Sequence, residues 1–162
     1  MSRNTTVIGT GTDRVFAVLA DGWTYGDWMV GVAHVCHVDR HWPHPGSRMR
    51  VLTGQWPLLK TRWLEVVRCQ ARHLLAIRAH WPLGRLHTEF RLLAREGRGT
   101  RVVLTEHPER QPLRGTRAVV NDLLLHRRHN ESLRRLADIA TRRDLSRPTG
   151  ALPGSPHGTT PL

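Results

Sequence analysis

The chain has 162 residues, and this length suits one domain because two independent hydrophobic cores would each be small. Hydrophobic residues make up 39% and charged residues 23% of the sequence, which excludes a fully disordered chain, a collagen-like repeat and a disulfide scaffold. The 25 Lys and Arg residues outnumber the 13 Asp and Glu residues, so the formal net charge is +12.

The positive charge is dispersed along the chain. Lys60 is the only lysine, and arginines occur from Arg3 to Arg147 with no run longer than two. A nucleic-acid surface usually gathers its charge on one face or one helix. The dispersed charge therefore predicts a general basic surface and no specific nucleic-acid partner.

The cysteines and the hydropathy pattern favour a cytoplasmic protein. Cys36 and Cys69 lack the spacing of a metal ribbon and fit a reducing compartment. The apolar run at 15–20 is too short for a secretory signal, and no segment approaches the ~18 apolar residues of a membrane helix. We therefore expect no membrane insertion.

Neither a metal nor a cofactor is expected. His34 and His37 would point to opposite faces of a strand, so they do not converge as metal ligands must. Gly9 and Gly11 lack the further glycine spacing of a dinucleotide-binding loop.

In chain order, the first expected elements are a short strand and two helices. β-branched residues at 4–8 favour a strand. Thr12 or Asp13 can then cap a helix whose apolar positions continue to residue 20. Residues 23–28 contain three aromatic side chains and suit a second, very short helix.

Residues 32 to 107 predict an antiparallel meander of six strands. Turn-forming residues separate the segments by loops that are too short for the crossovers that parallel neighbours need. In the last two segments apolar and charged residues alternate, so one face of the sheet is apolar and must be covered. The six segments are 32–38, 48–53, 61–69, 73–80, 86–94 and 100–107.

The segment 116–144 predicts the long helix that covers this face, because it contains no glycine or proline. The last 17 residues hold four prolines and three glycines and predict a disordered tail. We expect an α+β protein with a single domain at 1–144 and a tail at 145–162. The apolar stripe of the helix comprises Val119, Leu123, Leu133, Leu136 and Ala140, with His126 and Asn130 at the intervening positions.

Four local motifs follow one another along these elements: VFAVLADGWTYGDWMVG (15–31), WPHPGSRM (42–49), GTRVVLTEH (99–107) and NESLRRLADIA (130–140). Together they resemble the SRPBCC, or START-like, superfamily, and within it the polyketide cyclase/dehydrase and lipid-transport group. The resemblance covers residues 3 to 143. It implies the helix-grip fold, in which a curved antiparallel sheet of about seven strands, in the order β-α-α-β6-α, wraps around a long C-terminal helix.

The resemblance also implies an apolar cavity between sheet and helix that holds a hydrophobic small molecule, lipid-like or polyketide-like. It carries over no catalytic signature, so binding or carriage is the first hypothesis. The alternative is an enzyme of the polyketide cyclase/dehydratase type that uses Glu106 and His126 as acid and base. We expect a monomer or a weak homodimer.

Two Trp-Pro pairs are candidates for a lid over this cavity. Trp56 and Trp81 precede prolines in hairpin loops at the same end of the meander, and the resemblance places those loops over the cavity mouth. An indole offers a large apolar plate with one hydrogen-bond donor. The Trp42-Pro43 pair falls at the opposite end and is expected to be structural.

Two carboxylates are expected to face the interior. Glu106 alternates with apolar residues of the last strand, and Glu65 shares its register with Trp63. A carboxylate in an apolar cavity has its ionised form disfavoured and needs a partner. His126 and Asn130, on the helix stripe, are the expected partners.

Further ligand contacts are expected from the short aromatic helix and from the apolar faces of the strands and the long helix. These residues are Tyr25, Trp28, Trp63, Phe90, Leu104 and Leu123.

Overall fold

The computed structural model describes residues 2–54, 56–81, 84–97, 99–109 and 117–145. Within these ranges, the side chains of residues 2, 81, 117–125 and 143–145 are not described. The expected tail at 145–162 therefore lies, apart from its first residue, outside the described residues. The same holds for Pro82 and for the side chains of Trp81 and Leu123.

The predicted elements are all present, with boundaries close to those expected from the turn residues. Most connections that end the strands contain glycine or proline, and the glycine-free segment at 117–145 forms one helix. The elements are β1 (Ser2–Ile8), α1 (Thr12–Ala20), the 3-10 turn η1 (Gly22–Thr24), α2 (Tyr25–Trp28), β2 (Val32–Val38), β3 (Arg48–Thr53), β4 (Lys60–Gln70), β5 (Leu74–Trp81), β6 (Gly84–Arg95), β7 (Gly99–Pro108) and α3 (Arg117–Leu145).

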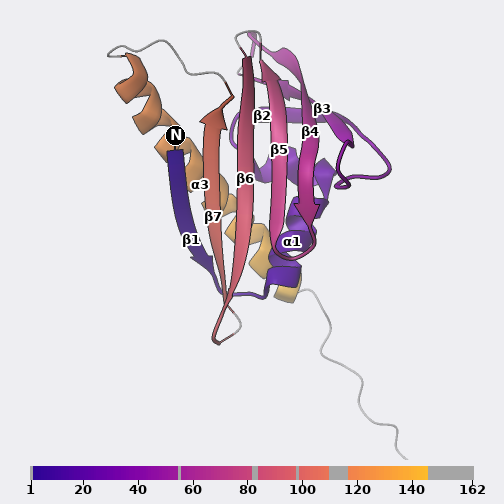
Figure 1. The fold of residues 1–162 in the computed structure, drawn as a ribbon, viewed down its shortest axis with the longest axis vertical. Helices are drawn as coiled ribbons and strands as arrows, with labels where there is room; N and C mark the ends of the chain where they lie inside the picture. The colour runs from indigo at the N-terminus through magenta and orange to yellow at the C-terminus, as the bar shows by residue number, and fades with distance from the viewer. Residues whose placement is uncertain (1, 55, 82–83, 98, 110–116, 146–162) are drawn as a thin grey trace, which may run out of the picture.

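The seven strands form one sheet in the order β1-β7-β6-β5-β4-β3-β2. Every neighbouring pair is antiparallel, which confirms the meander. β1 and β2 occupy opposite edges, so α1 and α2 carry the chain from one edge of the sheet to the other. In Figure 1 the strands lie in front and α3 runs behind them.

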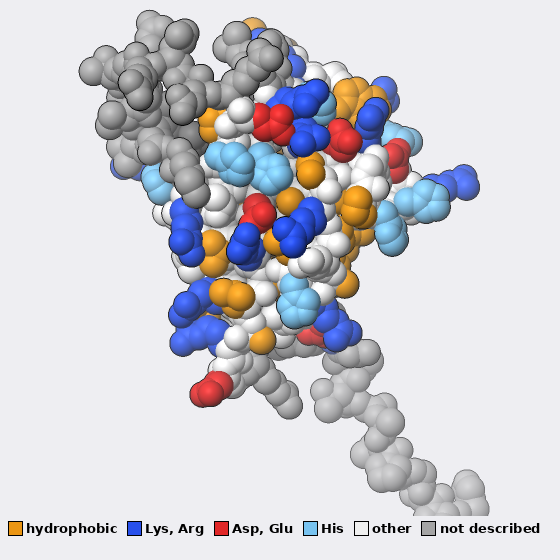
Figure 2. All heavy atoms as spheres, in the orientation of Figure 1, with side chains coloured by type: hydrophobic (Ala, Val, Ile, Leu, Met, Phe, Trp, Pro, Cys, Tyr) orange, Lys and Arg blue, Asp and Glu red, His pale blue; other side chains and the backbone are white. Residues whose placement is uncertain are grey.

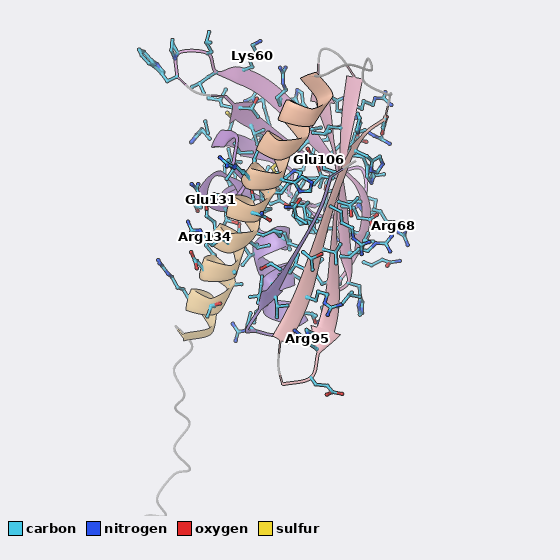
Figure 3. The ribbon with its side chains drawn as sticks, turned by 90° about the vertical axis from the view of Figure 1, so that its left-hand side faces the viewer. Lys60, Arg68, Arg95, Glu106, Glu131 and Arg134 are labelled. Atoms are coloured by element: carbon cyan, nitrogen blue, oxygen red, sulfur yellow. The ribbon has the colours of Figure 1, made fainter. Side chains whose placement is uncertain are left out.

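α1 and α2 contact α3, which runs along one side of the sheet (Figure 3). Val102, Leu104 and Glu106 of β7 are buried on the side that faces the helices, as the alternation predicts. Glu131 and Arg134 project from the far side of α3, away from the sheet. Hydrogen bonds from Arg134 and Arg135 lower the pKa of Glu131 to about 2. The α+β fold class, with a curved sheet around the C-terminal helix, is thus confirmed.

The register expected for β4 is wrong by one residue. Leu64 and Val66 are buried, whereas 42% of Trp63 is exposed and Glu65 faces the outer side of the sheet. A bulge interrupts the pairing of β4 with β5 at residue 67, so alternation cannot be extrapolated across it. The guanidinium carbon of Arg50 lies 5.9 Å from the centroid of the exposed Trp63 ring. Trp63 and Glu65 are therefore residues of the outer face.

The outer face of the sheet carries scattered positive charge. Figure 2 shows Lys and Arg side chains interspersed with histidines and apolar side chains on this face. His87 and His107 are cross-strand partners whose ring centroids lie 4.8 Å apart. Partial burial, and then the nearby charge of His107, lower the pKa of His87 below its ordinary value of 6.5. The charges of Glu89 and Glu109 raise the pKa of His87, and the charge of Arg78 lowers it.

We expect this histidine to make the fold less stable in mild acid. Because the fold disfavours protonated His87, the unfolded chain binds that proton more readily, and stability is lost as the pH falls from 6.5 toward the lower pKa of the folded state. NMR titration of the imidazole resonances measures this pKa. The His107→Gln variant should raise it, because a like charge is removed, and an unchanged titration would contradict the assignment.

No described helix combines the length and the apolar composition that crossing a membrane requires.

Candidate functional site

A polar cluster lies on the inner face of the sheet, under α3. Thr88 of β6 and Glu106 of β7 are cross-strand partners, and the Thr88 hydroxyl donates to Glu106 Oε2 over 3.2 Å. His129 Nε2, from α3, lies 3.2 Å from the same oxygen. The Glu106 and His129 side chains are each only 5% exposed. Figure 3 shows Glu106 between the sheet and the helix.

Apolar side chains surround this cluster. Trp28 of α2 is fully buried, and its ring meets that of Phe90 edge-on at 5.7 Å. Phe90 and Leu104 are cross-strand partners, two pairs further along the same two strands. In such a medium of low dielectric constant the contact between Glu106 and His129 is stronger than it would be in water.

The described residues enclose only a small cavity at this cluster. Its volume is about 10 Å³, which is room for one water-sized group. Small-molecule pockets start at about 300 Å³, so the hollow expected from the sequence is not present among the described residues. The cavity is lined by Trp28, Met29, Val30, Thr88, Phe90, Leu104, Glu106, Arg128, His129 and Ser132.

One wall of the cavity is the connector between α2 and β2, and α3 holds it through both backbone polar groups of Val30. The Val30 N–H donates to Ser132 Oγ over 3.0 Å, and Arg128 Nε donates to the Val30 carbonyl over 2.6 Å. Gly31 follows with φ of +96°, and a β-carbon there would lie 2.7 Å from Arg128 Nη2. The connector therefore needs a glycine where the guanidinium packs on it.

The Gly31→Ala variant is expected to lose about 1 to 3 kcal/mol of unfolding free energy, because alanine is strained at positive φ and meets Arg128. Gly26→Ala is the matched control, since nothing lies within 4 Å of its β-carbon position in α2. Urea denaturation of both variants measures the difference. Equal midpoints would show that the connector does not need glycine.

The structure places His126 and Asn130 against Asn4 of β1. Asn4 Nδ2 donates to Asn130 Oδ1 over 2.7 Å and to the His126 carbonyl over 3.1 Å. His126 Nδ1 lies 3.0 Å from Asn4 Oδ1. This cluster joins the edge strand to α3, and the imidazole that lies 3.2 Å from Glu106 is that of His129.

The phase of the α3 stripe explains why His129 was missed. His129, Leu133, Leu136 and Ala140 are buried and are spaced by four, three and four residues. Positions 129 and 130 lie four and three residues before Leu133, so both fit the helical spacing. The sequence-based prediction placed Asn130 on the buried face. Thr88, Arg128 and Ser132 were also missed, since only the folded chain places them at one cavity.

Tyr25 is a packing residue of the core. It is fully buried, its ring lies 5.6 Å from that of Trp42, and its hydroxyl donates to the Leu19 carbonyl over 2.9 Å. Burial, with smaller contributions from Cys69 and Asp21, raises the pKa of Tyr25 far above its ordinary value. Tyr25 therefore stays neutral. The structural role expected for Trp42 agrees with its burial in this core.

The expected lid lies partly outside the described residues. The side chain of Trp56 is described and is 85% exposed, so it does not pack over the interior. Ligand contact by Trp56, Trp81 or Leu123 stays a prediction.

A second, open depression of about 650 Å³ lies along the loop between β2 and β3. Its carboxylate, Asp39, accepts hydrogen bonds from the Arg48 backbone N–H over 2.8 Å and from His37 over 3.2 Å. The Arg48 hydrogen bond lowers the pKa of Asp39. The depression lacks the apolar walls of a hydrophobic-ligand site. Across the described chain, no three His, Cys, Asp or Glu side chains gather as metal ligands would.

A curved antiparallel sheet that grips a long C-terminal helix is the helix-grip fold, as the four sequence motifs predict. Comparison with solved structures agrees. The aromatase/cyclase Zhui from Streptomyces sp. R1128 superposes with a TM-score of 0.68 at 20% identity, over 93% of this chain and 97% of that protein.

Two further solved structures are similar. NE0264 from Nitrosomonas europaea has a TM-score of 0.70 at 12% identity, over 88% of this chain and 95% of that one. DynU16, from the dynemicin biosynthetic locus, has a TM-score of 0.61 at 15% identity, over 85% of this chain and 45% of that one. No family model and no curated protein matches the sequence. At these identities the likeness shows the fold.

Proposed function

We propose that this protein binds a hydrophobic small molecule, lipid-like or polyketide-like, between the sheet and α3, with its polar group at Glu106 and His129. The observation that carries the proposal is a carboxylate and an imidazole 3.2 Å apart, each 5% exposed, among apolar walls. The shared fold with an aromatase/cyclase supports it.

A purely structural role explains this pair less well. Burying two ionisable groups costs hydration that their mutual attraction only partly offsets, and apolar residues of similar size often stabilise a fold as well or better. Glu106 also keeps one buried oxygen, Oε1, without a hydrogen-bond partner among the described residues. Ligand recognition gives these groups a use that packing does not.

A ligand larger than water must displace part of the wall. β6 and β7 are joined by a continuous ladder of ten residue pairs, so the sheet side resists opening. The connector at 29–31 is held to α3 by the hydrogen bonds of Val30 with Ser132 and Arg128. Entry of a ligand between the connector and α3 breaks the two hydrogen bonds of Val30 and leaves the sheet intact.

Titration with emodin, a planar polyphenol, and with palmitate tests the proposal by calorimetry. We expect one of them to bind wild-type protein and Glu106→Gln or His129→Gln to weaken binding about tenfold, the effect of one lost hydrogen bond to a charged group. Glu131→Gln, on the outer side of α3, is the matched control and should bind as wild type. Absence of binding, or equal binding by Glu106→Gln, would contradict the proposal.

The second candidate is an enzyme of the cyclase/dehydratase type, and one observation favours it. A carboxylate and an imidazole at 3.2 Å can hold and pass a proton beside a ligand carbonyl. His129 then takes the acid/base role first expected of His126. With a poly-β-ketone substrate, Glu106→Gln and His129→Gln should each slow cyclisation by about 100-fold or more. Unchanged turnover would remove this candidate.

A further inference from the structure

Two buried polar atoms at the cavity are left with neither a hydrogen bond nor an ion pair among the described residues. They are Trp28 Nε1 and Glu106 Oε1. Trp28 is fully buried and Glu106 is 5% exposed, so neither atom is satisfied by bulk solvent. Buried polar groups are nearly always hydrogen-bonded, and each exception calls for an explanation.

The two atoms are complementary. An indole Nε1–H can only donate, and a carboxylate oxygen can only accept. Both side chains line the same cavity of about 10 Å³. Because a space of that size holds one water-sized group, a single oxygen placed in it lies next to both side chains.

Neighbouring side chains hold both groups in place. The Trp28 ring lies 4.7 Å from the Tyr25 ring and 5.7 Å from the Phe90 ring. The other carboxylate oxygen, Glu106 Oε2, is engaged by the Thr88 hydroxyl and by His129. Glu106 Oε1 is therefore the oxygen that remains for a ligand.

We infer that the ligand carries a hydroxyl group, phenolic or alcoholic. Its oxygen accepts a hydrogen bond from Trp28 Nε1–H, and its O–H donates a hydrogen bond to Glu106 Oε1. The inference rests on the proposed function and names its ligand class. A ketone oxygen would satisfy Trp28 alone, and an ionised ligand carboxylate has no proton with which to donate a hydrogen bond to Glu106 Oε1. A hydroxyl satisfies both atoms at once.

Three matched probes test this: 2-naphthol, 2-methoxynaphthalene and naphthalene, titrated by calorimetry. We expect 2-naphthol to bind wild-type protein about tenfold or more tightly than the other two, since only its oxygen can donate. Trp28→Phe keeps an aromatic ring but removes the donor, and Glu106→Leu removes the acceptor. Each variant should abolish the preference for 2-naphthol over the other two probes, whatever its effect on naphthalene affinity itself.

Trp42→Phe is the matched control, because Trp42 Nε1 is also buried without a partner among the described residues but Trp42 does not line the cavity. It should keep the preference. Equal binding of 2-naphthol and 2-methoxynaphthalene would overturn the inference, with water alone serving both atoms, while naphthalene binding would still support the proposed function. Binding by none of the three would overturn both. If Trp28→Phe lost affinity for all three probes equally, Trp28 would serve only in packing, and the inference would be overturned.

Discussion

The Trp28→Ala variant is expected to lose about 3 to 5 kcal/mol of unfolding free energy, the range for removing a buried aromatic side chain. Trp28 is fully buried and joins α2 to the sheet through Phe90 and to its own helix through Tyr25. The loss combines the transfer of the indole to water with the cavity left behind. Guanidinium denaturation followed by circular dichroism measures it.

Trp23→Ala is the matched control for this variant. Trp23 lies five residues earlier and is 61% exposed, so its replacement should change stability by less than about 0.5 kcal/mol. If Trp28→Ala and Trp23→Ala lost equally little unfolding free energy, this would contradict the packing of Trp28 in the apolar wall of the site.

The second large effect is expected at the buried pair. His129→Leu should lose about 3 kcal/mol or more, because the Glu106 carboxyl group is then left inside the protein without the imidazole that lies 3.2 Å from it. The double variant Glu106→Leu/His129→Leu should be much closer to wild type, since an apolar pair of similar volume carries no such penalty. The two single losses are therefore not expected to add.

A double-mutant cycle in urea measures this coupling. The exposed Glu131–Arg134 pair on the far side of α3 is the comparison, with its nitrogen and oxygen 2.8 Å apart. Water and salt screen that pair, so its coupling should be far smaller and should weaken with added salt. Additive single losses at Glu106 and His129 would show that the two side chains do not interact.

The fold was predictable because its signals are local. Turn residues and alternation delimit strands one at a time, and the glycine-free segment delimits α3, so small errors do not accumulate along the chain. The inward placement of Glu106 followed from the unbroken alternation of β7. The same method failed in β4, where the bulge at residue 67 breaks the alternation, so the residues after it do not show which face Trp63 and Glu65 occupy.

The candidate site was predictable only in part. Glu106, Trp28, Phe90 and Leu104 were expected in the interior and are buried there. His129 was not expected, because positions 129 and 130 fit the helical period equally well until the sheet selects one of them. Helical spacing defines a face to within one position, and a contact of 3.2 Å depends on that position.

The amino-acid sequence alone determined the order of elements, the single covered face of the sheet and the buried carboxylate, because each depends on periodicity within one segment. Only the tertiary structure decided which histidine meets Glu106, which face of β4 is outer and how little space the described interior leaves. Those features depend on how side chains from β6, β7, α2 and α3 meet. No periodicity within a single segment encodes the 3.2 Å contact between Glu106 and His129.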